Sequence, residues 1–131
     1  MAKKTLRIDL DVGFSLLGVS CHLKDYRFAW TLNHALGTNF KKEDPFIIEE
    51  SEQEFSRYIH HTDSEEMIMF SNKSTNGYLV RKKKEVDYWI KFHEDIDQET
   101  TKSTLDTLRQ NNLVLAVFEE HDRITKEQFV Y

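Results

Sequence analysis

Apolar and polar residues alternate over two stretches of the sequence, residues 5–12 and residues 86–92. The apolar positions are Leu6, Ile8, Leu10 and Val12 in the first stretch and Val86, Tyr88, Ile90 and Phe92 in the second. Successive side chains of a strand point to opposite faces of a sheet, so this period of two predicts a half-buried strand in each stretch. The second pattern is the clearest in the chain, and we expect a central strand there.

Shorter apolar runs predict further strands at residues 14–19, 46–48, 55–59, 67–70 and 113–118. Pro45 precedes the second of these runs and should mark an edge or a turn, because proline has no N–H to donate to a neighbouring strand. Gly18, inside the first run, suits a bend or a bulge. The sequence therefore predicts a sheet built largely from short strands.

The dipeptide Asn76-Gly77 stands between two extended runs. Both residues tolerate a positive φ, which two-residue hairpin turns require. We therefore expect residues 67–70 to pair antiparallel with a strand that begins at Tyr78, and Lys82 to lie near the edge of the sheet.

Two segments show the spacing of an amphipathic helix, residues 22–36 and residues 98–112. The positions expected on the buried faces are Leu23, Tyr26 and Trp30 in the first segment and Leu105 and Leu108 in the second. Ser20 and Asp97 are suitable N-caps, and Gly37 suits the position after the first helix. Together the patterns predict an α+β fold, with an antiparallel sheet of five to seven strands and two helices packed on one face.

The length predicts a single domain, residues 1–131, because a chain of this size buries roughly two-thirds of its unfolded surface around one core. An apolar fraction of 39% and a charged fraction of 31% are typical of a globular protein and not of a disordered chain. Residues 121–131 are charged and then apolar. They are expected to form either a short docked segment or an arm for a partner.

Cysteine usage and hydropathy indicate the compartment. Cys21 is the single cysteine, which excludes an intramolecular disulfide and favours a reducing environment. Residues 1–10 lack the apolar stretch of a signal peptide, and no run of 18 apolar residues occurs. We therefore expect a cytoplasmic protein without membrane association.

Charge is unevenly distributed along the chain. The net charge of −5 argues against a typical nucleic-acid-binding protein, because these usually carry a basic excess. However, residues 1–42 carry +4 and residues 71–92 carry +4, whereas residues 43–70 carry −8 and residues 93–131 carry −5. This segregation predicts a surface with oppositely charged faces.

The residues Val86-Asp87-Tyr88 match the second half of a known signature, Ile-Pro-Glu-x-x-x-Val-Asp-Tyr. The chain resembles the bacterial family named for this signature, the IPExxxVDY family, which is typical of Bacteroidetes. Further parts of the resemblance are the strings Phe14-Ser15-Leu16-Leu17-Gly18-Val19, Lys24-Asp25-Tyr26-Arg27 and Asn33-His34-Ala35-Leu36-Gly37. The resemblance implies a single-domain cytoplasmic protein and supplies no catalytic residues.

The first half of the signature differs in this chain. Val80, Arg81 and Lys82 stand where the family has Ile, Pro and Glu, so a rigid turn with an acidic residue is replaced by a basic run. The chain is therefore either a diverged member of the family or a specialised paralogue.

The basic run is the main candidate site, and it consists of Arg81, Lys82, Lys83 and Lys84. Basic residues beside aromatic ones suit phosphate contacts combined with stacking on unpaired bases, and Trp89 is the expected stacking residue. The residues Lys3, Lys4 and Arg7 would extend this RNA-binding patch if the first strand neighbours it. The alternative is an edge strand that lysines protect against aggregation.

Other chemistry-bearing residues favour structural roles. His60 and His61 are adjacent in a predicted extended segment and point to opposite faces, so a surface turn is favoured over a metal site with Asp63. Cys21 beside His22 is interpreted as a buried structural thiol, not as a nucleophile. Asp87 is expected to be paired with a basic group or to cap a turn. The sequence thus predicts no catalytic residue, metal or cofactor.

These observations favour a non-catalytic RNA-contacting accessory protein, either ribosomal or ribosome-associated, whose partners are ribosomal RNA and neighbouring ribosomal proteins. The alternative is an adaptor or regulator of a cytoplasmic enzyme, which would dock through its acidic block, residues 43–66, or its apolar tail, Phe129-Val130-Tyr131. A small-molecule substrate is not expected. An enzyme using Cys21 or the histidine pair is the third hypothesis.

Overall fold

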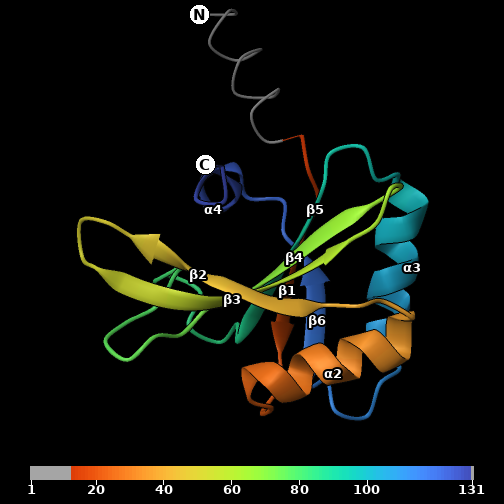
Figure 1. The fold of residues 1–131 in the computed structure, drawn as a ribbon, viewed down its shortest axis with the longest axis horizontal. Coiled ribbons are helices and arrows are strands. Elements are labelled where there is room, and N and C mark those ends of the chain that lie inside the picture. Colours follow the sequence, from red (N-terminus) through yellow and green to blue (C-terminus); the bar gives the residue numbers. More distant parts are fainter. Residues whose placement is uncertain (1–12, 131) are drawn as a thin grey trace, which may run out of the picture.

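The structure is a computed structural model that describes residues 13–130, and its centre is one open antiparallel sheet (Figure 1). The six strands found in these residues lie in the order β2-β3-β4-β5-β1-β6. The elements are β1 (Leu16–Ser20), α2 (Asp25–Leu36), β2 (Lys41–Ile48), β3 (Gln53–His61), β4 (Glu66–Ser71), β5 (Tyr88–Phe92), α3 (Gln98–Arg109), β6 (Ala116–Glu119) and α4 (Arg123–Glu127). The predicted α+β fold is confirmed. The strand predicted at residues 5–12 lies outside the described residues.

Strand β5 is central, as its strict alternation predicts. It pairs antiparallel with β4 on one side, where Trp89 lies opposite Phe70, and with β1 on the other, where Trp89 lies opposite Gly18. Trp89 and Phe92 are fully buried on opposite faces, because both faces of this strand are covered. Every side chain of β5 therefore has a fixed environment.

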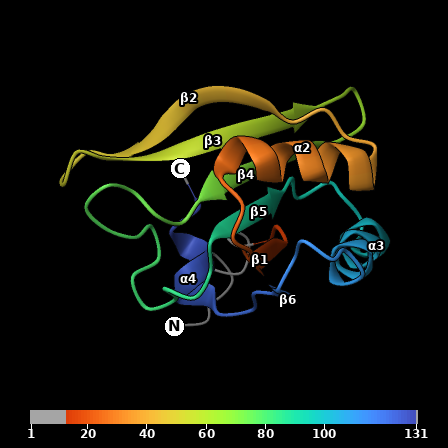
Figure 2. The same ribbon diagram turned by 90° about the horizontal axis from the view of Figure 1, so that it is seen from below.

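The two longer helices, α2 and α3, cover one face of the sheet, as predicted (Figure 2). Phe28 of α2 stacks on Tyr88 of β5, with ring centroids 4.6 Å apart. Helix α3 begins at the predicted N-cap, since the Asp97 carboxylate accepts a hydrogen bond of 2.8 Å from the backbone N–H of Thr100. Leu108 is fully buried, as predicted, and the half-buried Leu105 packs against the same core.

The opposite face is covered by two irregular parts of the chain, the connection between β4 and β5 and the C-terminal segment that contains α4 (Figure 2). Phe129 is fully buried here and packs edge-on against Phe70, with ring centroids 5.2 Å apart. Of the two alternatives for residues 121–131, the docked segment is therefore the one found in the described part, which ends at Val130.

Gly18 allows the close approach of two rings on this face. A Cβ atom there would lie 2.6 Å from the Phe118 ring and 3.0 Å from the Trp89 ring. The pairing of β1 continues regularly through Gly18 on both sides, so the predicted bend or bulge is wrong. The residue is a glycine because the aromatic rings occupy the space of a side chain.

The buried face of α2 differs from the prediction. The helix begins at Asp25 and buries Phe28, Ala29, Thr31 and Leu32, whereas Tyr26 and Trp30 are 59% and 54% exposed. The predicted cap is also wrong, because the Ser20 hydroxyl donates to the Glu85 carbonyl instead. Gly37 follows the helix with φ of 68°, as predicted for a left-handed C-cap. The sequence contains two overlapping apolar rows, and tertiary packing selects the row of Phe28 and Leu32.

The expected hairpin after β4 is present only as a fragment. Residues 74–77 form a turn closed by the bond from Ser74 N–H to the Gly77 carbonyl, and a single bridge joins Lys73 to Tyr78. The chain then leaves the ladder, and β4 pairs with β5 instead. The predicted strand from Tyr78 onward, with Lys82 near its edge, is therefore wrong.

Strand β2 lies at the edge of the sheet, as the single proline predicts. The pairing of β2 with β3 shifts register between Glu43 and Phe46, around Pro45. The tip that joins these two strands carries the exposed carboxylates of Glu49, Glu50 and Glu52. In Figure 1 this hairpin extends away from α2 and α3.

Candidate functional site

The basic residues 81–84, named the basic turn below, lie in the connection between β4 and β5 and not in a strand. The backbone makes two consecutive turns, with Lys83 N–H donating to the Val80 carbonyl at 3.1 Å and Val86 N–H donating to the Lys83 carbonyl at 3.0 Å. Arg81, Lys82 and Lys84 are exposed, whereas Lys83 is half-buried. The four residues are therefore not equivalent.

The buried side chain of Asn72 holds the basic turn in place. Its Oδ1 accepts hydrogen bonds from the Val80 N–H at 2.8 Å and from the Trp89 indole N–H at 2.9 Å. Its Nδ2 donates to the carbonyls of Lys83 at 2.9 Å and of Val86 at 2.8 Å. An amide has two donor hydrogens and two acceptor lone pairs, and all four are used. Asn72 thus fixes both ends of the basic turn to the central strand.

Lys83 has an internal partner. Its ammonium lies 3.0 Å from Oε1 of Glu120, whose side chain is 5% exposed. No other group in the described residues donates to this oxygen, while Glu120 Oε2 accepts from the backbone N–H of Asp122. Because a buried carboxylate requires a paired charge, Lys83 serves the fold and connects the basic turn to the start of the C-terminal segment.

The predicted stacking residue is not available. Trp89 is fully buried, and its indole N–H is bonded to Asn72, so the prediction that it contacts bases is wrong. Tyr88 is also buried, and its hydroxyl donates to the Leu23 carbonyl at 2.5 Å. Tyr78 is half-buried, and the Lys84 ammonium lies 5.6 Å from its ring centroid. The aromatic residue that accompanies the basic turn is therefore Tyr78.

Asp87 has the paired, structural environment that its position in the sequence predicts. Its Oδ1 lies 2.9 Å from the Lys73 ammonium, and its Oδ2 accepts from the Cys21 N–H at 2.8 Å. The hydrogen bond and charge of Asp87 raise the pKa of Lys73. This carboxylate therefore links the end of the basic connection to the residues that follow β1.

A groove with a volume of about 480 Å³ lies beside the basic turn. Its walls come from the tip of the β2–β3 hairpin, from the basic turn and from α4. The lining includes Tyr78, Arg81 and Lys82, and opposite charges are supplied by Glu50 and Asp122. The groove can accept a polar ligand that carries both charge and a planar apolar group.

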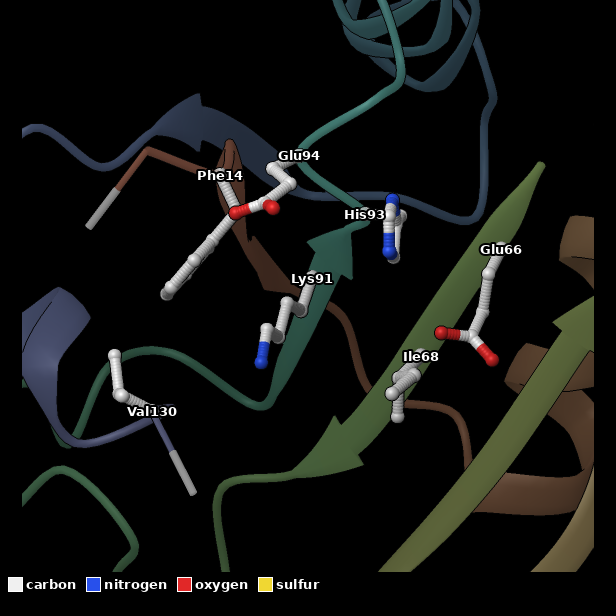
Figure 3. A pocket seen from close by; sticks show the side chains of 7 residues that line it. All are labelled: Phe14, Glu66, Ile68, Lys91, His93, Glu94 and Val130. Carbon is white, nitrogen blue, oxygen red and sulfur yellow. The ribbon is translucent and has the colours of Figure 1, made fainter. Parts of the chain in front are cut away.

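A second pocket, of about 280 Å³, lies on the same face of the sheet as α4 (Figure 3). The Lys91 ammonium lies between the ring of Phe14, 4.6 Å away, and the Phe129 carbonyl, to which it donates at 2.7 Å. Burial lowers the pKa of Lys91, while the charges of Glu66 and Glu94 oppose this effect. Phe14 and Val130 line the pocket together with Ile68 of β4.

The remaining predicted site residues are Lys3, Lys4 and Arg7, and they lie outside the described residues. Among the predicted contact residues within residues 13–130, the structure therefore exposes Arg81, Lys82 and Lys84 together. It assigns Lys83 and Trp89 to internal contacts.

Cys21 and the histidine pair have structural environments. Cys21 is buried, as predicted, and burial raises the pKa of its thiol. His60 is buried in β3, where its Nδ1 accepts from the Asn39 N–H at 2.9 Å and its Nε2 lies 3.0 Å from Glu65 Oε1, so the predicted surface turn is wrong for this residue. Within residues 13–130 no three His, Cys, Asp or Glu side chains form a group suited to a metal ion.

Sequence patterns do not predict the environments of two residues, Asn72 at the basic turn and Trp30 on α2. Asn72 is one polar residue at the end of an apolar run, and no local pattern distinguishes it from a loop asparagine. Trp30 was assigned to the core on its spacing from Leu23 and Tyr26. The sequence signal that indicates an exposed Trp30 is the second apolar row of the helix, Phe28 with Leu32, which can face the sheet instead.

None of the helices described in residues 13–130 has the length and apolarity needed to span a bilayer. No protein-family model matches the chain, and no curated protein matches it either. The resemblance to the IPExxxVDY family, which rests on Val86-Asp87-Tyr88 and the earlier strings, therefore stays a prediction.

Proposed function

We propose that this chain is a non-catalytic accessory protein that contacts RNA through the basic turn. The observation that carries the proposal is the exposure of Arg81, Lys82 and Lys84 at one rigidly held turn. In the part of the chain that the structure describes, none of these three cations lies within salt-bridge distance of a carboxylate. Three unneutralised charges at one place favour contact with a phosphate backbone.

The geometry of the turn supports contact with a folded or single-stranded RNA more than with a long duplex. The cations occupy one short turn beside a groove, and the half-buried Tyr78 lines that groove. Three phosphate contacts would give a slope of about −2 in a plot of log affinity against log salt for a single strand. Such a contribution is modest, so other contacts must add to it.

The partner in this proposal is ribosomal RNA with its neighbouring ribosomal proteins. A chain of net charge −5 that contacts RNA through one basic turn leaves most of its surface for solvent or proteins. This division suits an accessory subunit at the surface of a ribonucleoprotein particle. Cys21 is buried and burial raises the pKa of its thiol, so this residue offers no exposed thiolate nucleophile.

The test is ribosome co-sedimentation of a variant with Arg81→Glu, Lys82→Glu and Lys84→Glu. The matched control changes Lys41, Lys42 and Lys102 to Glu, because these lysines are also exposed and the net charge changes equally. We expect the first variant to leave the ribosomal fraction at moderate salt and the control to remain. Equal co-sedimentation of the first variant and the wild type would refute the proposal.

A second candidate is an adaptor that docks a basic protein on the acidic hairpin tip. The observation in its favour is the exposure of Glu49, Glu50 and Glu52 on the hairpin between β2 and β3. Of the apolar tail, Phe129 is buried in the chain's own core, so the hairpin tip is the docking surface in this candidate. A partner that survives nuclease treatment and is lost after changing the three glutamates to Lys would favour the adaptor over the RNA-contacting protein.

A further inference from the structure

The outward face of α2 carries an unusual set of exposed side chains. Tyr26 and Trp30 are 59% and 54% exposed, and they stand one helical turn apart, with His34 one turn further on. Arg27 is exposed next to Tyr26. Two large aromatic side chains that are each more than half exposed on one helix face form an apolar patch, and such patches mark sites for a ligand or a partner.

Trp30 is held in a defined orientation. Its ring is stacked with His34 at a centroid distance of 3.7 Å and an interplanar angle of 28°. The His34 imidazole is itself fixed, because its Nδ1 donates to the Trp30 carbonyl at 3.0 Å. One face of the indole is therefore covered, and little rotamer freedom is left to be lost when a ligand stacks on the other.

A cavity of about 230 Å³ lies on this face, lined by Tyr26, Arg27 and Trp30. Its walls combine two aromatic rings with a guanidinium group. These groups suit a planar ring that stacks and an attached anion that pairs with Arg27.

The charge around the cavity favours an anionic ligand. Lys24 and Arg27 are exposed, whereas the nearby Asp25 is half-buried. The Asp25 carboxylate is engaged at the start of the helix, where its Oδ1 accepts a hydrogen bond from the Tyr26 N–H at 2.7 Å. The exposed charges on this face of the helix are therefore positive.

We infer that Tyr26, Arg27 and Trp30 form a stacking site for an unpaired base of single-stranded RNA. The inference rests on the proposed RNA contact and adds its second point of attachment. Residues four apart in a helix are separated by about 6 Å along the axis, which allows a base to stack on Trp30 while a neighbouring group contacts Tyr26. Arg27, between them, is placed to neutralise the linking phosphate.

The stacking site and the basic turn are joined by short contacts. The Ser20 hydroxyl donates to the Glu85 carbonyl at 2.6 Å, and the Cys21 N–H donates to the Asp87 carboxylate at 2.8 Å. The residues that lead into α2 are thus fixed to the residues that lead out of the basic turn. One strand of RNA that contacts Lys84 can therefore continue toward Lys24 at the start of α2.

The test is a titration of a dye-labelled single-stranded uridine dodecamer with the full chain, in which the anisotropy of the dye gives the affinity and the tryptophan fluorescence is recorded alongside. The two tryptophans are Trp30, which is exposed, and Trp89, which is fully buried, so quenching by a stacked base reports on Trp30. We expect quenching in the wild type and about tenfold or greater loss of affinity in Trp30→Leu. Trp30→Phe keeps an aromatic face, so it should bind nearly as the wild type without the quenching.

The outcomes separate this inference from the proposed function. Wild-type affinity in both Trp30→Leu and Tyr26→Leu, together with lost affinity in the basic-turn variant, would overturn the stacking site and leave the RNA contact standing. No binding by the wild type would overturn both. If light scattering shows a wild-type dimer that Trp30→Leu converts to a monomer, the row is a contact between two copies and the stacking site is refuted.

Discussion

Replacing Asn72 with Asp tests whether one buried amide holds the basic turn. The substitution keeps the shape of the side chain but exchanges the Nδ2 donor for an oxygen. The carbonyls of Lys83 and Val86, which accept from Nδ2 at 2.9 and 2.8 Å, would then face an acceptor. The bonds that Oδ1 accepts from Val80 and Trp89 can persist, so the change isolates the two donated bonds.

The expected loss of stability at pH 7 is about 3–5 kcal/mol. The Val86 carbonyl loses its donor, at a cost of about 1–3 kcal/mol, and the buried carboxylate adds a desolvation cost, whereas the Lys83 carbonyl keeps the hydrogen bond from the Val86 N–H. A domain of this kind has a total stability of about 5–15 kcal/mol, so the variant should unfold at a much lower urea concentration. The affinity for RNA should fall as well, because the turn loses its fixed conformation.

The assay is urea unfolding followed by circular dichroism at pH 7 and pH 4, with Asn76→Asp, in the exposed turn, as the control. Burial raises the folded-state pKa of the introduced carboxyl above its unfolded value. The destabilisation is therefore complete above the folded pKa and decreases as the pH falls toward the unfolded value, because the protonated group donates again. A change below about 1 kcal/mol at pH 7 would refute the role assigned to Asn72.

Three further predictions concern single residues. Lys83→Ala should destabilise the fold by about 1–3 kcal/mol in urea unfolding, which is less than the loss expected for a fully buried ion pair because Lys83 is partly exposed. Adding Glu120→Gln should restore most of the lost stability, and additive losses in the double variant would contradict the pairing. Native Cys21 should react with a thiol reagent at pH 8 at least about tenfold more slowly than in urea, and equal rates would disprove its burial. Hydrogen bonds from Thr100 lower the pKa of Asp97, so its stabilising charge is present above the unfolded pKa and is lost as pH falls through the folded one. Asp97→Asn should therefore lose less melting temperature between pH 7 and pH 3 than the wild type.

Strand β5, where alternation is clearest, could be predicted from the sequence, and its central position was confirmed. Alternation works because the period of two is set by the backbone itself. The prediction of a hairpin beyond Asn76-Gly77 was wrong because of contacts made outside the turn itself. The side chain of Asn72 takes up the Val80 N–H, which a continued ladder would have used, and β5 replaces the expected partner.

The environments of the two tryptophans are opposite to those predicted, since Trp89 is buried and Trp30 is exposed. Trp89 stands beside a basic run, which suggested exposure, but its strand is covered on both faces. Trp30 has helical spacing from Tyr26, which suggested burial, but the helix turns the neighbouring row of Phe28 and Leu32 toward the sheet. Spacing gives the period of a helix, and only the surface it packs against decides which row is buried.

The sequence predicts where the candidate site lies but not which of its residues are exposed. Exposure of Arg81, Lys82 and Lys84 follows from their charge, since a long cationic side chain is seldom buried without a partner. The exception, Lys83, depends on a carboxylate far along the chain at Glu120. No local sequence pattern predicts an ion pair between residues so far apart in the chain.

The ion pair between Lys83 and Glu120 also constrains how this protein can change over generations. A neutral residue at position 83 leaves the buried Glu120 carboxylate uncompensated, so it should persist only alongside a neutral residue at position 120. The fold does not require a charge at Arg81, Lys82 or Lys84 in this way. In descendants of this chain, the residues at positions 83 and 120 should therefore change together. The residues at the other three basic positions should vary independently, unless binding to a partner conserves them.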